Sequence, residues 1–154
     1  MNSSAAAEIR EAKGGDLPAL LRMMKGLAEQ PPAIPFDEGE VRAALDKFLG
    51  HADLGQAWLL WLGEKSAGYV ILTLGYSFEF RGRDAFIDEL YIEPEFRRRG
   101  LGRRALEFLE EKARASGVNA LHLEVDRGND RAMELYRRSG YENHGRHLLT
   151  KWLR

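Results

Sequence analysis

Hydrophobic residues in the first third of the chain recur mainly at helical spacing. Apolar side chains from Leu17 to Ala28 fall on one stripe, with Asp16 placed to cap the helix and Pro18 in its first turn. A second amphipathic helix is predicted over 37–49, and a short strand over 9–12 precedes both. The first third therefore predicts the order strand, helix, helix.

The middle of the chain changes to short apolar runs separated by turn residues. Such runs joined by short connections are typical of an antiparallel meander. The strands are predicted over 57–62, 67–74 and 85–92, with 75–80 continuing or restarting the second strand and turns at 63–66 and 81–84.

The last third returns to helical spacing, interrupted by one alternating segment. A helix is predicted over 101–116, a strand over 119–125, a helix over 129–139 and a closing hairpin over 141–153. A strand, a helix and a second strand in succession imply a parallel pair with a crossover helix. We therefore expect an α/β (α+β) fold with a mixed sheet, antiparallel first and parallel in the centre.

Composition narrows the class of protein. A chain of 154 residues with 44% hydrophobic and 31% charged residues has the size and balance of one globular domain. The absence of cysteine excludes disulfides, zinc–thiolate sites and a cysteine nucleophile. A net charge of −1 gives no general attraction for nucleic acid. No apolar run is long enough to span a bilayer, and the first residues do not form a signal peptide, so we expect a cytoplasmic protein.

The most informative segment lies between the strand over 85–92 and the helix that begins at Leu101. It contains five arginines and two glycines: Arg97, Arg98, Arg99, Gly100, Gly102, Arg103 and Arg104. A helix N-terminus has unpaired N–H groups and partial positive charge, and glycine lets the backbone approach a ligand closely. The segment therefore predicts a phosphate site.

Three kinds of phosphate-binding site are candidates for this segment. A P-loop requires a Gly-Lys-Ser/Thr ending, which the chain lacks. Gly100 to Ala105 matches the dinucleotide fingerprint, with Glu124 near the end of the next strand, but seven residues separate the strand from the first glycine. The third reading is a cradle for the pyrophosphate of coenzyme A.

Three motifs in this order resemble the GNAT superfamily of acyl-CoA-dependent N-acetyltransferases, with a likeness to its diamine acetyltransferases. The resemblance covers nearly the whole chain and is sharpest over 85–141. Arg97, Gly100 and Gly102 match the family's Gln/Arg-x-x-Gly-x-Gly/Ala motif, and 86–96 looks like its fourth strand and the run that follows. Asn129, Ala132, Leu135, Tyr136, Gly140 and Tyr141 are similar to its later motif.

The resemblance implies a coenzyme site and a fold. Two central parallel strands, here 85–92 and 119–125, would splay apart with helices on both faces of the sheet, and the pantetheine arm of acetyl-CoA would lie in the gap. No metal is implied. The residues implied to bind the coenzyme are Leu90, Tyr91, Ile92, Arg97, Arg98, Arg99, Gly100, Leu101, Gly102, Arg103, Asn129, Ala132 and Tyr136.

The resemblance also indicates catalytic groups. Tyr136 matches the family tyrosine near the coenzyme sulfur and would donate a proton to the departing thiolate. Asp88 and Glu89 are the two candidate bases, and strand alternation predicts that only one of them faces the cleft. Because the chain has no cysteine for an acyl intermediate, we expect direct attack of a primary amine in a ternary complex.

The acceptor is less defined by the sequence. Tyr76, Phe78, Glu79, Phe80 and Trp58 are candidate pocket residues, and a small-molecule amine is favoured over a peptide amine. Two alternatives are a noncatalytic acyl-CoA-binding or regulatory module and a nucleotide-cofactor protein. We expect no nucleic-acid or membrane partner, and a homodimer is consistent with the family.

Overall fold

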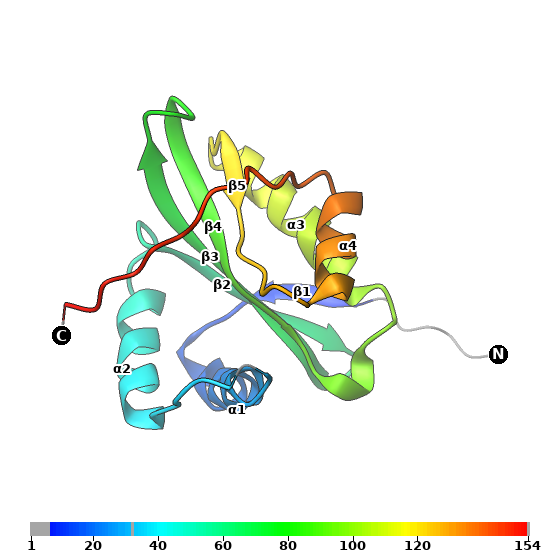
Figure 1. Cartoon of the computed structure of the whole chain (residues 1–154). Coiled ribbons are helices and arrows are strands. Elements are labelled where there is room, and N and C mark those ends of the chain that lie inside the picture. Colours follow the sequence, from blue (N-terminus) through cyan, green and yellow to red (C-terminus); the bar gives the residue numbers. More distant parts are fainter. Residues whose placement is uncertain (1–6, 32, 154) are drawn as a thin grey trace. The chain divides into compact units, whose positions relative to one another are not determined.

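The computed structural model describes residues 7–31 and 33–153 (Figure 1). The chain forms two compact units, one up to Glu124 and one from Val125 onward, and each is described by itself. Within the described residues, no helix combines the length and the apolar character needed to cross a bilayer.

The first unit contains a five-stranded sheet whose order follows the sequence. The pairings β1·β2, β2·β3 and β3·β4 are antiparallel, and β4·β5 is parallel. The strands are β1 (Glu8–Glu11), β2 (Gly55–Leu62), β3 (Lys65–Ser77), β4 (Gly82–Ile92) and β5 (Ala120–His122). The expected mixed, mostly antiparallel fold is thus confirmed, with the parallel pair at one end of the described sheet.

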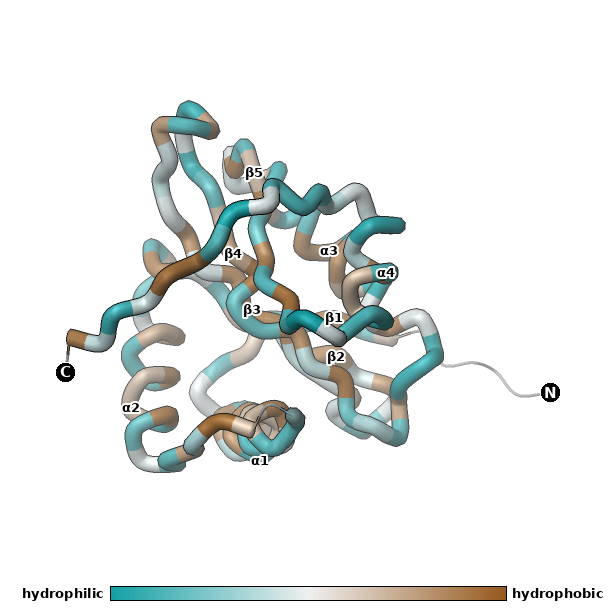
Figure 2. The backbone as a smooth tube through the Cα atoms, in the orientation of Figure 1, coloured by the Kyte–Doolittle hydropathy of each residue, from teal (hydrophilic) through white to brown (hydrophobic). Residues whose placement is uncertain are grey.

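Helices cover both faces of this sheet (Figure 1). One face packs against α1 (Leu17–Ala28) and α2 (Glu38–Leu49), and the other against α3 (Leu101–Ala115). Figure 2 shows brown and teal positions alternating along α2, as expected of a helix with one buried stripe. The core on the α1 and α2 face contains Leu17, Leu20, Leu21, Met23, Leu45, Ala57, Leu59, Tyr69, Ile71 and Tyr91.

The start of α1 differs from the sequence expectation. A single 3-10 turn, η1 (Gly14–Asp16), precedes the helix, and Asp16 adopts helical dihedral angles. Its carboxylate therefore reaches back to accept the Lys13 N–H at 2.9 Å and does not cap α1. Asp37 does act as a cap, because it accepts the Glu40 N–H at 2.9 Å at the start of α2.

The second unit contains α4 (Asp130–Arg138), and its start agrees with the sequence. The Asn129 side chain caps it by accepting the Ala132 N–H at 3.1 Å. The predicted hairpin over 141–153 is wrong, because none of these residues is in a strand. Apolar residues occur there as adjacent pairs, Leu148-Leu149 and Trp152-Leu153, and neighbours on a strand would point to opposite faces, so the segment has no single face to bury.

Candidate active site

One edge of β4 is open along the half that leads to α3. β5 pairs with β4 only from Asp84 to Phe86, and β5 ends at His122. The Glu93 N–H donates to Ala67 O on the β3 side at 2.9 Å. Since backbone groups of alternate residues point to opposite neighbours, those of Leu90 and Ile92 point to the open edge, whereas those of Tyr91 point to β3. Two of the three predicted backbone positions therefore face the gap.

A β-bulge lies at the two acidic residues of β4. Ile87 pairs with Leu72 and Glu89 pairs with Ile71, which leaves Asp88 as the extra residue. The bulge interrupts the alternation and directs both Asp88 and Glu89 to the face covered by α1 and α2. The expectation that strand alternation turns the two side chains to opposite faces is therefore wrong, because it assumed an unbroken strand.

The carboxyl groups of Asp88 and Glu89 are partly buried, and this raises the pKa of both. Burial raises the pKa of Glu89, the negative charge of Asp88 raises it further, and a hydrogen bond from the Tyr69 hydroxyl lowers it. Partial burial also raises the pKa of Asp88. A carboxylate with a raised pKa is a better proton acceptor near neutral pH, so either group suits the role of a general base.

Backbone geometry at the start of α3 favours an anion. Arg98 and Gly100 have φ angles of 63° and 76°, which fold the chain tightly after the turn η2 (Pro94–Phe96). Gly100 stands at the N-cap, where no side chain bonds the first-turn N–H groups, and the first turn contains no acidic residue. These N–H groups and the positive end of the helix dipole are therefore available to a phosphate.

The arginines around this helix start divide into two sets. Arg97 Nε donates to Ile92 O at 2.9 Å, and Arg99 Nη2 donates to Glu95 O at 3.4 Å, so both fasten the loop. Arg103 forms an ion pair with Glu107 at 2.8 Å. Arg98 and Arg104 are exposed, and their side chains have no hydrogen bond or ion pair within the described part of the chain. These two arginines are the ones best placed to bind an external anion through their side chains.

The remaining predicted site residues lie in the second unit. The side-chain oxygen of Asn129 is used as the cap of α4, which leaves its amide N–H groups as donors for a ligand. The Tyr136 ring lies 6.0 Å from the Tyr141 ring, and burial raises the pKa of the Tyr136 hydroxyl. The membership of Asn129, Ala132 and Tyr136 in the site stays a prediction. They belong to the second unit, whereas β4 and α3 belong to the first.

The acceptor side of the site differs in part from the expectation. Trp58 is buried and packs edge-on against Phe108 of α3, so it belongs to the core. Tyr76 and Phe78 are exposed, with ring centroids 5.9 Å apart. Among the residues that the structure describes, no three His, Asp or Glu side chains are grouped to hold a metal ion.

Two polar pairs on the α1 and α2 face were not predicted from the sequence. His122 Nε2 lies 3.3 Å from Asp84 Oδ2, and the His122 ring packs against Phe80. Tyr69 bonds Glu89, as described above. A tyrosine inside the apolar run of β3 was a usable signal, because a buried hydroxyl needs a partner. Nothing in the sequence indicated the pairing of Asp84 with His122.

The chain is similar in sequence to known acetyltransferases. The model of the acetyltransferase (GNAT) family matches residues 21–141. Thialysine N-epsilon-acetyltransferase of Bos taurus is 30% identical over 146 residues, which cover 88% of this chain and 84% of that enzyme. These two matches concern sequence and extend across most of the chain.

Solved structures are similar over almost the full length. An integron cassette protein from the mobile metagenome of Cole Harbour Salt Marsh has a TM-score of 0.83 and 35% identity, covering 95% of this chain and 90% of that one. A predicted acetyltransferase from Clostridium acetobutylicum, crystallised with acetyl-CoA, has a TM-score of 0.80 at 16% identity, covering 94% and 96%. The second likeness concerns the fold alone.

Proposed function

The chain belongs to the acetyltransferase (GNAT) family of acyl-CoA-dependent N-acetyltransferases, and from this premise we propose that it transfers acetyl from acetyl-CoA to the primary amine of a small molecule. The family model extends from 21 to 141 and so crosses the boundary between the two units. This extent supports the proposal that both units contribute to one acetyltransferase domain.

One observation carries the proposal: the open edge of β4 leads, through the turn η2, to the uncapped, arginine-rich start of α3. The first-turn N–H groups of α3 with Arg98 and Arg104 would bind the pyrophosphate. The backbone groups of Leu90 and Ile92 would bond the pantetheine amides along the open edge. This arrangement would bring the thioester beside the bulge that contains Asp88 and Glu89.

The chemistry then follows from groups already described. Asp88 or Glu89 accepts a proton from the amine, which attacks the thioester carbonyl directly, since the chain has no cysteine to form an acyl intermediate. A backbone N–H on the open edge of β4 stabilises the oxyanion. Tyr136 donates a proton to the departing thiolate, which needs its hydroxyl to be protonated at neutral pH. The raised pKa of Tyr136 is consistent with this role.

The acceptor is proposed to be a small amine, with thialysine as the first candidate. This choice is supported by the name of the bovine relative, an N-epsilon-acetyltransferase. The exposed aromatic pair Tyr76 and Phe78, on the hairpin that joins β3 to β4, is proposed as part of the acceptor surface. An alkyl amine with an apolar chain fits such a surface.

The test is an acceptor screen with acetyl-CoA in which the released thiol is measured. We expect thiol release that depends on both the protein and a primary amine, and mass spectrometry should find the acetylated amine. Amino acids, thialysine, polyamines, aminoglycosides and a lysine peptide form the panel. Tight coenzyme binding with no turnover on any amine would contradict the proposal and favour a noncatalytic binding module.

A further inference from the structure

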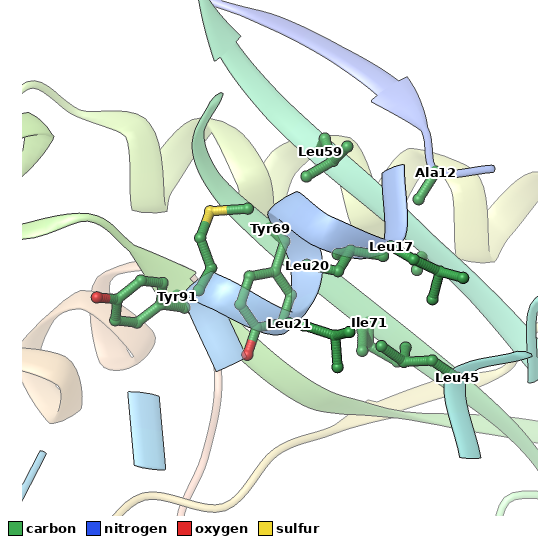
Figure 3. Close-up of a cluster of buried hydrophobic side chains, with 11 residues drawn as sticks. Ala12, Leu17, Leu20, Leu21, Leu45, Leu59, Tyr69, Ile71 and Tyr91 are labelled. Atoms are coloured by element: carbon green, nitrogen blue, oxygen red, sulfur yellow. The ribbon is translucent and has the colours of Figure 1, made fainter. Parts of the chain in front are cut away.

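Tyr69 is a fully buried tyrosine at the centre of β3, with an exposed fraction of 0%. Its ring belongs to the same cluster as Leu20 and Leu21, and Figure 3 shows the hydroxyl pointing away from Leu59. The hydroxyl donates to Glu89 Oε2 at 2.7 Å. A buried hydroxyl without a hydrogen-bond partner destabilises the fold, so the bond to Glu89 stabilises Tyr69 in the core. The same bond also orients the Glu89 carboxylate.

The bond has consequences for the shape of the site. A tyrosine ring enclosed by the core has little freedom, so the Glu89 oxygen that it bonds is fixed in position. The second oxygen, Oε1, has no hydrogen bond within the described residues and stays available as an acceptor. Glu89 directly precedes Leu90, whose backbone faces the open edge of β4. Asp88 is more exposed than Glu89 and has no side-chain hydrogen bond to anchor it within the described residues.

We propose that Tyr69 is a positioning residue for acetyl transfer: by holding Oε2 of Glu89, it makes Oε1 the atom that accepts the proton of the attacking amine, in preference to Asp88. This inference rests on the proposed function. The proton moves from nitrogen to Oε1, the electron pair of nitrogen forms the C–N bond, and the C–S pair leaves on sulfur, which takes a proton.

Charges around the pair set the direction of its pH dependence. On β4, Asp88 raises the pKa of Glu89, and the bond from Tyr69 lowers it. Tyr91 lies beside Tyr69, with ring centroids 5.9 Å apart, and donates to Glu93. On α1, Arg22 contacts Ser66 and Glu93, and Glu29 acts on Tyr91; neither contributes to the pKa of Glu89. A base must be deprotonated, so any rise in its pKa moves the acidic limb of kcat/KM to higher pH.

The first test compares three variants by their pH profiles. Tyr69→Phe is expected to move the acidic limb to higher pH and to lower kcat about tenfold, since a bond to a charged group is lost. Asp88→Asn is expected to move the limb to lower pH, and Glu89→Gln to remove it. In the Glu89→Gln background, Tyr69→Phe should have no further effect on kcat. An equal effect of Tyr69→Phe in both backgrounds would show a merely structural role and overturn the proposal.

A second test does not depend on turnover. The Glu89 carboxyl is titrated by NMR in carbon-13-labelled protein, and its pKa is expected to be higher in Tyr69→Phe than in the unaltered chain. An unchanged pKa would overturn the pairing. If the unaltered chain acetylates no amine, the proposed function and the catalytic role of the pair fail together, while the NMR result still decides the pairing. If the Tyr69→Phe variant does not fold, the Glu89→Gln variant still provides a test. An acidic limb that remains in its pH profile of kcat/KM would overturn the proposal.

Discussion

Reversing the charges of Arg98 and Arg104 together is expected to weaken binding of coenzyme A at least 100-fold, a loss of about 2.7 kcal/mol. Both side chains are exposed at the start of α3 and have no partner in the described residues, so the double variant Arg98→Glu/Arg104→Glu removes no internal bond. It places two negative charges where the pyrophosphate is proposed to lie. Isothermal titration with coenzyme A measures the change.

Two controls separate a local effect from a general one. Arg42→Glu/Lys47→Glu makes the same change in net charge on α2, which covers the opposite face of the sheet, and should bind coenzyme A as the unaltered chain does. S-acetylpantetheine has no pyrophosphate, so the Arg98→Glu/Arg104→Glu variant should retain its affinity for that compound. Unchanged affinity for coenzyme A would show that the phosphates bind elsewhere.

Replacing Tyr136 with phenylalanine is expected to lower kcat about 100-fold and to leave the KM for acetyl-CoA nearly unchanged. The change removes the hydroxyl that is proposed to protonate the thiolate and keeps the ring. Because burial raises the pKa of Tyr136 above its ordinary value of 10.0, the group stays protonated at neutral pH. Any decrease in the kcat of the unaltered chain that comes from this group should therefore have its midpoint above pH 10. Steady-state kinetics with the acceptor found in the screen tests both points.

Tyr141 provides the matched control for this variant. Its ring lies 6.0 Å from that of Tyr136 in the same unit, so Tyr141→Phe removes a hydroxyl from the same surroundings. We expect a change in kcat of less than threefold. A Tyr136→Phe variant with the full kcat would remove the proposed acid from the mechanism and leave solvent as the proton donor.

Much of the fold could be predicted from local pattern. The stripe from Leu17 to Ala28 and the turn at 63–66 each determine an element from a few neighbouring residues, and the structure confirms α1 and the β2–β3 hairpin. The start of α3 could also be predicted, because Gly100 and the arginines beside it are contiguous in sequence. Features set by nearest neighbours on the chain were therefore the predictable ones.

Features set by pairing between strands could not be predicted in this way. The bulge at Asp88 depends on how β4 aligns with Ile71 and Leu72 of β3, and alternation along β4 alone gives the wrong face for Glu89. The use of Arg97 to bond Ile92 O depends on the fold of the loop between them. The hairpin predicted over 141–153 is wrong because a strand needs a partner edge, which the sequence does not show.

The most direct measurement is a crystal structure of the protein with coenzyme A. We expect the pyrophosphate at the first-turn N–H groups of α3, between Arg98 and Arg104, and the pantetheine amides bonded to Leu90 and Ile92 along the edge of β4 that β5 leaves open. A coenzyme bound elsewhere, or a side chain of the protein itself filling that edge, would contradict it.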